Sequence, residues 1–142
     1  MYYWILLVIG VLATAVFLTL RVKRGGIAAL YAKAVASLCF IATAVAATNH
    51  NRSFLGFGSF VTFGLICGLL GDVWLDLKWI YLQDKDSYLY SGFIFFLIGH
   101  ISFVAAEYTA SPYTKGSIIV SVLAALVFAV IAVNLEKPLK MH

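Results

Sequence analysis

Long runs of hydrophobic residues alternate along this chain with short stretches that are polar or rich in glycine. Five runs are each close to the roughly 20 residues that an α-helix needs to cross the hydrocarbon core of a bilayer. They cover residues 2–20, 27–47, 57–78, 88–108 and 116–133. The pattern predicts an all-α protein, a polytopic transmembrane helical bundle of about five helices in which residues 1–142 form a single transmembrane domain.

The composition argues against a soluble protein. Hydrophobic residues make up 63% of the 142 residues and the mean hydropathy is +1.00, whereas an ordinary soluble domain is roughly 45–50% apolar. Five spans and their loops use nearly the whole chain, which leaves no room for a separate soluble domain. We therefore expect a multi-pass integral membrane protein, which in a bacterium would lie in the cell membrane.

The charged residues indicate a topology. The net charge is +4, from ten Lys and Arg against six Asp and Glu, and most basic residues fall in predicted loops and tails, which does not favour a nucleic-acid partner. An outside N-terminus puts seven basic residues on the cytoplasmic side and two outside, so the positive-inside rule favours N-out and C-in. The seven are Arg21, Lys23, Arg24, Lys78, Lys85, Lys137 and Lys140, and the two are Arg52 and Lys115.

Two carboxylates interrupt the third hydrophobic run. An ionisable side chain within a transmembrane segment is costly and usually persists because function or an internal partner requires it. Asp72 and Asp76 are four residues apart and project from roughly one helix face. Three glycines, Gly64, Gly68 and Gly71, are expected along that same face, where they would let a neighbouring helix approach and enclose the carboxylates.

Other ionisable residues are predicted at a similar depth. In the N-out arrangement, Lys33 and Asp72 lie about 9 Å from the cytoplasmic face and His100 about 15 Å, at 1.5 Å per helical residue. One interpretation is an Asp72–Lys33 pair that only holds the bundle together, and another is that Lys33 snorkels to the headgroups. A third is a polar pocket with an acid and a base. Asp76 is expected nearer the surface, paired with Lys78 or the headgroups.

No metal ion and no other cofactor is expected. Zinc hydrolases usually supply three protein ligands, mostly histidine, and His100 is the only histidine inside a predicted span. Cys39 and Cys67 lie in apolar segments without metal-like spacing, so they are expected to be small packing residues.

Two motifs resemble the YhhN-like family of multi-pass membrane proteins. They are Gly-Asp-Val-Trp-Leu at residues 71–75 and Gly-His-Ile-Ser-Phe at residues 99–103, which match the family's Gly-Asp-x-x-Leu step and its Gly-His step followed by an aromatic residue. Lys33 would match a Lys-Pro step of the family, although Ala34 replaces the proline. Further helices follow in the family, so the resemblance implies a short or truncated member.

The resemblance implies an activity, because the characterised members of the family are lysoplasmalogenases. These integral membrane hydrolases cleave the vinyl-ether bond of lysoplasmalogens into a fatty aldehyde and a glycerophospho-alcohol. By this analogy Asp72 is the acid or the electrostatic stabiliser, and His100 orders the attacking water. Lys33 and Asp76 are expected to bind the substrate near its headgroup, with Lys33 meeting the phosphate of the lysophospholipid.

Two other function classes remain open at the level of sequence. The alternative is a non-catalytic lipid-binding or structural membrane bundle that retains the family scaffold. A proton-coupled transporter would also use buried Asp and His, but no span shows the Pro-interrupted pattern of many transport sites. In either main hypothesis, a homodimer is one way to complete the pocket.

Overall fold

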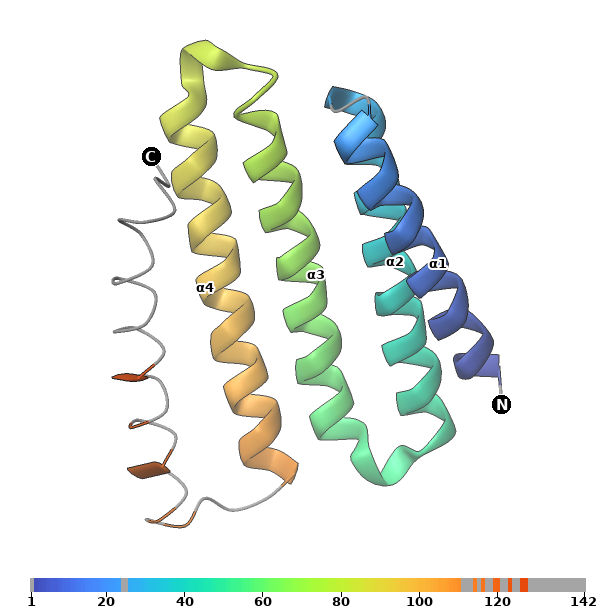
Figure 1. Ribbon diagram of the computed structural model, residues 1–142. Coiled ribbons are helices and arrows are strands. Elements are labelled where there is room, and N and C mark those ends of the chain that lie inside the picture. Colours follow the sequence, from blue (N-terminus) through green and yellow to red (C-terminus); the bar gives the residue numbers. More distant parts are fainter. Residues whose placement is uncertain are drawn as a thin grey trace. The chain divides into compact units, whose positions relative to one another are not determined.

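The computed structural model describes residues 2–23 and 26–110, with isolated positions beyond them at 114, 116, 119, 120, 123, 126 and 127. Four long helices account for most of the described chain: α1 (Tyr2–Lys23), α2 (Gly26–His50), α3 (Leu55–Leu77) and α4 (Lys85–Ala110). Two short 3-10 turns connect them, η1 (Arg52–Phe54) and η2 (Leu82–Asp84). The all-α prediction is therefore confirmed for the described residues (Figure 1).

Four of the predicted spans coincide with the four helices. Each predicted boundary lies within three residues of a helix end, because backbone hydrogen bonding continues past the last apolar residue into the polar flanks. All four helices are long and apolar enough to cross a membrane. The predicted fifth span, residues 116–133, lies outside the described residues except for isolated positions, within a separate compact unit that comprises residues 111–142.

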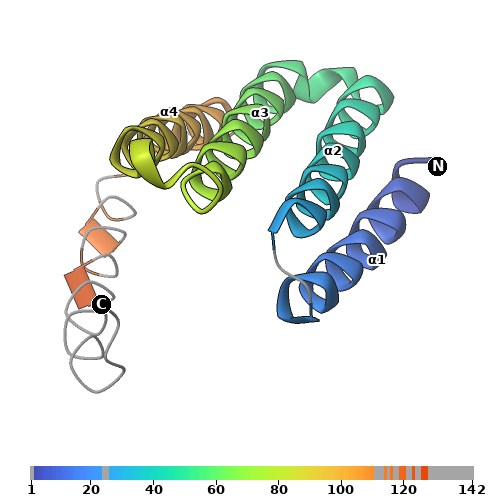
Figure 2. The same cartoon turned by 90° about the horizontal axis from the view of Figure 1, so that it is seen from above.

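In the first unit, residues 1–110, the helices pack in chain order. Helix α1 packs on α2, α2 on α3, and α3 on α4, and the four helices stand side by side (Figures 1 and 2). Helix α2 begins at Gly26, whose φ of +62° is a left-handed conformation that glycine adopts without strain. Neighbouring helices run antiparallel, so residues far apart in sequence share one level.

Helices α3 and α4 meet through glycines. A Cβ added at Gly71 would lie 3.2 Å from the carbonyl oxygen of Gly92, and one added at Gly92 would lie 3.2 Å from that of Gly71. Further along the same interface, a Cβ at Gly99 would lie 3.1 Å from the carbonyl oxygen of Gly64. The two backbones are therefore in direct contact, as in other membrane helix pairs with small residues at the interface.

The expectation that these glycines share one helix face with the two carboxylates is wrong for Gly64 and Gly71. Gly64 and Gly71 face α4, whereas the carboxylates of Asp72 and Asp76 contact cations of α1 and α2. The reason is the helical repeat, since successive residues are rotated by about 100° and Gly71 and Asp72 therefore point in different directions. Gly68 is different from the other two, because a Cβ there would meet open space.

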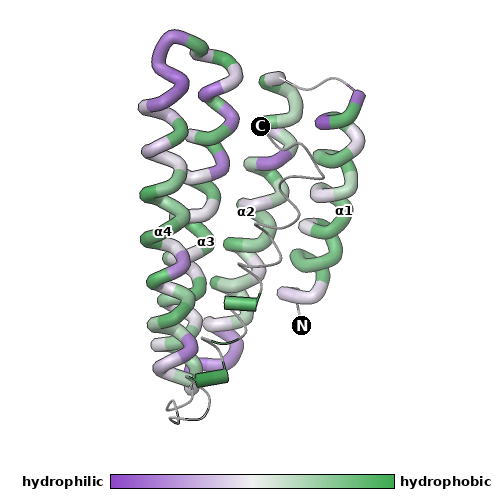
Figure 3. Tube along the Cα trace, turned by 60° about the vertical axis from the view of Figure 1, so that its left-hand side comes forward, coloured by the Kyte–Doolittle hydropathy of each residue, from purple (hydrophilic) through white to green (hydrophobic). Residues whose placement is uncertain are grey.

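The interior of this unit is built from small residues. Ala29, Ala36, Cys67 and Ala106 are buried, while many large apolar side chains face outward. Figure 3 shows hydrophobic colour along the lengths of the helices and hydrophilic colour mainly near their ends. This distribution suits helices surrounded by lipid, where large apolar side chains gain nothing by turning inward. Cys39 and Cys67 are both free thiols.

Candidate functional site

A cluster of four charged side chains joins three helices. Lys33 Nζ on α2 lies 2.8 Å from Asp72 Oδ1 on α3 and 3.9 Å from Asp76 Oδ2. Arg21 Nη1 on α1 lies 3.1 Å from Asp76 Oδ1. We call Arg21, Lys33, Asp72 and Asp76 the ion cluster. Its two cations balance its two anions, which is the condition under which charges persist in an apolar environment.

Local structure explains why these four residues meet. Arg21 lies in the last turn of α1, and Lys33 lies about two turns into α2, so both are near the α1–α2 turn. Asp72 and Asp76 occupy the last two turns of α3, one turn apart. Because α3 runs antiparallel to α2, its C-terminal end returns to the level where α2 begins. The depth predicted for Lys33 and Asp72 from helix rise is thus consistent with their contact.

Asp76 differs from its prediction. It is the most buried member of the cluster, with 6% of its surface exposed, and it pairs with Arg21 and not with Lys78. Lys78 is rotated by about 200° from Asp76 on the helix, and its ammonium group lies 5.1 Å from the ring centroid of Trp79. Asp76 is therefore buried between helices near the end of α3, and the predicted pairing with Lys78 is wrong.

Lys33 also turns inward. Its ammonium group contacts Asp72 and lies 5.9 Å from the ring centroid of Phe17 on α1. The side chains of Lys33 and Asp72 are 23% and 25% exposed. Of the interpretations open for Lys33, the described structure thus has the ion pair and not a side chain extended to the headgroups.

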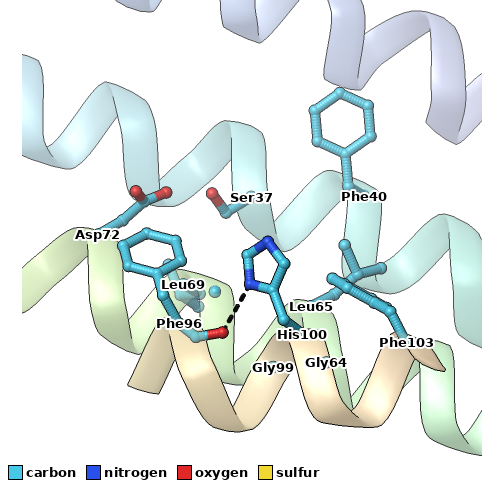
Figure 4. Close-up of a pocket in the computed structure, with 11 residues that line it drawn as sticks. Ser37, Phe40, Gly64, Leu65, Leu69, Asp72, Phe96, Gly99, His100 and Phe103 are labelled. Carbon is cyan, nitrogen blue, oxygen red and sulfur yellow. Dashed lines mark hydrogen bonds between the residues drawn. The ribbon is translucent and has the colours of Figure 1, made fainter. Parts of the chain in front are cut away.

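Next to the cluster, a cavity of about 190 Å³ opens between α2, α3 and α4. Asp72 borders it from α3 and His100 from α4 (Figure 4). The missing side chain of Gly68 leaves part of this space empty. Most of the remaining lining is apolar or small, and consists of Ser37, Phe40, Gly64, Leu65, Leu69, Phe96, Gly99 and Phe103.

The orientation of His100 is fixed by α4 itself. Its Nδ1 lies 2.7 Å from the carbonyl oxygen of Phe96, one turn earlier. A carbonyl oxygen only accepts hydrogen bonds, so Nδ1 carries the proton and donates it. Nε2 is then the nitrogen available to the cavity, and Figure 4 shows it directed toward α2, on which Ser37 lies. The ring of Phe103 packs edge-on at a centroid distance of 6.3 Å.

The structure therefore brings the four predicted site residues into two adjoining groups. Asp72 belongs to both, because it borders the cavity and pairs with Lys33, whereas His100 only borders the cavity and Asp76 lies in the ion cluster. Within residues 2–23 and 26–110 no three His, Cys, Asp or Glu side chains gather in a way that would hold a metal ion.

Sequence reasoning missed Arg21 and the aromatic part of the cavity. The charge pattern of the sequence uses Arg21 only as a topology signal. Its position could have indicated a role in the site. Arg21 lies shortly before the Gly25–Gly26 pair of the sequence, which is typical of a chain reversal, and a reversal there brings it to the level of the first turns of α2. Phe96 and Phe103 flank His100 at four and three residues' distance, so helical spacing alone puts them on its face.

Long apolar helices that enclose an ion cluster are typical of an integral membrane protein. The model of the YhhN family matches residues 28–141, and the chain belongs to this family. The match confirms the resemblance to this family. The matched range includes Lys33, Asp72, Asp76 and His100, whereas Arg21 on α1 precedes it. No curated protein and no solved structure matches the chain.

Proposed function

We propose that this protein is a multi-pass membrane hydrolase that cleaves the vinyl-ether bond of lysoplasmalogens, as the family resemblance implies. The observation that supports it best is that Asp72 and His100, from two separate motifs, border one cavity. Substrate would enter from the cytoplasmic leaflet in the N-out arrangement. The products would be a fatty aldehyde and a glycerophospho-alcohol.

The reaction needs a proton donor, an anion and a water molecule. Protonation of the vinyl ether at its β-carbon gives an oxocarbenium ion, which water attacks to form a hemiacetal. The hemiacetal then collapses, so that one water is consumed and no redox change occurs. Asp72 is held by Lys33 at 2.8 Å, so we assign it the electrostatic stabilisation of the cation. His100 would act in its doubly protonated form, in which Nδ1–H stays on the Phe96 carbonyl oxygen and Nε2–H delivers the proton. The neutral Nε2 would then accept a proton from the attacking water.

The size of the cavity limits what enters it. Pockets that enclose a whole drug-sized ligand measure about 300–1,000 Å³, whereas this one is about 190 Å³. We infer that only the reacting bond and its neighbouring carbons occupy it, and that the alkenyl chain extends between helices into lipid. The polar head would then lie at the ion cluster.

Lys33 keeps a role toward the substrate in this proposal. An ammonium group has three donors, and the one that contacts Asp72 leaves others for the phosphate of the substrate. Asp76 is buried, and its Oδ2 lies 3.9 Å from Lys33 Nζ. We propose that it acts on the substrate through Lys33 and not by direct contact.

The test is aldehyde release by the purified protein in detergent with a 1-alkenyl lysophospholipid. We expect turnover by the unchanged protein, and a fall in kcat/KM on the order of 10²-fold or more in Asp72→Asn, because one preorganised electrostatic contact is typically worth that much. Asp86→Asn is the matched control, since Asp86 is an exposed carboxylate in the first turn of α4. It should leave turnover unchanged.

A second substrate separates chemistry from binding. The saturated 1-alkyl lysophospholipid of equal chain length has no carbon–carbon double bond to protonate, so it should bind as an inhibitor and release no aldehyde. Absence of aldehyde from the alkenyl lipid would contradict the proposed activity. Equal turnover by the unchanged protein and Asp72→Asn would remove Asp72 from the mechanism.

The alternative function, a non-catalytic lipid-binding or structural bundle, also has one observation in its favour. The 2.8 Å contact between Lys33 and Asp72 pairs the two charges with each other, as a purely structural pair would. This alternative predicts that the alkenyl and alkyl lipids bind equally and that neither is cleaved. The same pair of lipids therefore distinguishes the two functions.

A further inference from the structure

Lys33 stands between two carboxylates and is shared unequally. Its Nζ lies 2.8 Å from Asp72 Oδ1 but 3.9 Å from Asp76 Oδ2. Asp76 is the more buried of the two acids, and its Oδ2 has no hydrogen-bond partner among the described residues. Burial strengthens the attraction between opposite charges. The preference of Lys33 for the less buried acid therefore needs a cause.

Arg21 supplies that cause. Its guanidinium lies 3.1 Å from the other oxygen of Asp76 and neutralises this carboxylate from the side of α1. Without Arg21, Asp76 would be a buried anion whose nearest cation is Lys33, and a buried unpaired charge is strongly unfavourable. Lys33 has a flexible four-carbon stem, so a shift of roughly 1 Å, the difference between its two contact distances, would transfer it to Asp76.

We propose that Arg21 is a positioning residue of the site, which by pairing with Asp76 keeps Lys33 on Asp72. Its effect on turnover rests on the proposed function, whereas its effect on the Lys33–Asp72 contact does not. Arg21 lies on α1, ahead of the matched residues 28–141. The site is thus completed by a helix outside the region that defines family membership.

Three variants test the effect on turnover. Arg21→Gln should lower kcat about tenfold with little change in KM, because Lys33 leaves Asp72 and the stabilising carboxylate is no longer held in place. Adding Asp76→Asn should recover at least about threefold of this loss, because Lys33 then has a single anionic partner again. The control is Lys23→Gln, which removes an exposed cation from the same helical turn.

A role of Arg21 in stability alone predicts a different turnover for the double variant. If Arg21 only stabilises the fold, the double variant should be at least as impaired as Arg21→Gln, and a double variant without recovery overturns the proposal. Arg21→Lys retains the charge and should keep most of the turnover. If Arg21→Gln does not yield folded protein, the double variant decides alone, because a folded and active double variant supports the charge-balance argument and an unfolded or inactive one contradicts it.

A second measurement does not depend on activity. Thermal unfolding midpoints in detergent are measured for Lys33→Met, Asp72→Asn and their combination in two backgrounds. The first background retains Arg21. The second carries Arg21→Gln, so that Asp76 is the only other charged member of the cluster. The non-additive part of the shifts reports the contact between Lys33 and Asp72. We expect it to fall by at least about half without Arg21. An unchanged non-additive part overturns the proposal, even in a protein that releases no aldehyde.

Discussion

At the scale of single residues, the side chain of His100 is oriented by contacts within its own helix, α4. Its Nδ1 is committed to the carbonyl oxygen of Phe96 at 2.7 Å, and Phe103 packs against the edge of its ring. The ring therefore presents one nitrogen to the cavity in a fixed direction. A group held in this way loses little conformational freedom when substrate or water arrives.

This arrangement leads to a prediction for His100→Gln. Glutamine retains a polar side chain of similar length but does not transfer protons at neutral pH, so turnover of the alkenyl lysophospholipid should fall on the order of 10²-fold. KM should change little. His50→Gln is the control, because His50 packs against Tyr3 at the opposite end of α2 with a centroid distance of 5.6 Å. A similar loss in both variants would contradict a specific role for His100.

At the scale of elements, the contact between α3 and α4 sets the geometry of the cavity. Asp72 follows Gly71 and His100 follows Gly99, and both glycines lie where the two backbones touch. Any side chain added at this interface would separate the helices. The two residues of the proposed chemistry would then move apart, although neither had been changed.

Gly92→Ala tests this interface. The added methyl would lie 2.8 Å from two carbon atoms of Leu75 and 3.2 Å from the carbonyl oxygen of Gly71, so we expect a loss of about 1–3 kcal/mol from overpacking. Gly56→Ala is the control, because a Cβ at Gly56 meets no atom within 4 Å. The thermal unfolding midpoint in detergent should fall for Gly92→Ala only. Equal midpoints for the two variants would show that the helices adjust without cost.

At the scale of the whole molecule, the ion cluster lies at the end of the four-helix unit where α1 ends and α2 begins. We propose that this end faces the cytoplasm, on the basis of the seven-to-two distribution of basic residues. The turn η1 would then lie outside and η2 inside. Polar heads of lipids in the inner leaflet would reach the cluster directly.

Cysteine labelling tests the orientation. Ser53→Cys places a thiol at an exposed position within η1, and Ser87→Cys places one at an exposed position just after η2. Both are made in a background where the native Cys39 and Cys67 are replaced by alanine. A membrane-impermeant maleimide added to intact cells should label position 53 only. Labelling at position 87 from outside would overturn the N-out arrangement, and labelling of both after permeabilisation confirms that each thiol is reactive.

The helices and the shared level of Lys33 and Asp72 were predictable because both depend on distance along one chain. A run of apolar residues defines a span whatever surrounds it, and a rise of about 1.5 Å per residue then places Lys33 and Asp72 at one level. Family membership was equally accessible, since the two motifs are local. The partner of Asp76 could not be predicted from the sequence, because Arg21 and Lys33, which contact it, come from two other helices.

By itself, the sequence thus determined the all-α class, four helices with their approximate ends, and the motif residues that belong to the YhhN family. The tertiary structure alone decided how each helix is turned about its axis. That rotation directs Gly64 and Gly71 of α3 to α4, and Asp72 and Asp76 to α1 and α2. The physical reason is that rise along a helix is fixed by backbone hydrogen bonds, whereas rotation is chosen by packing between helices.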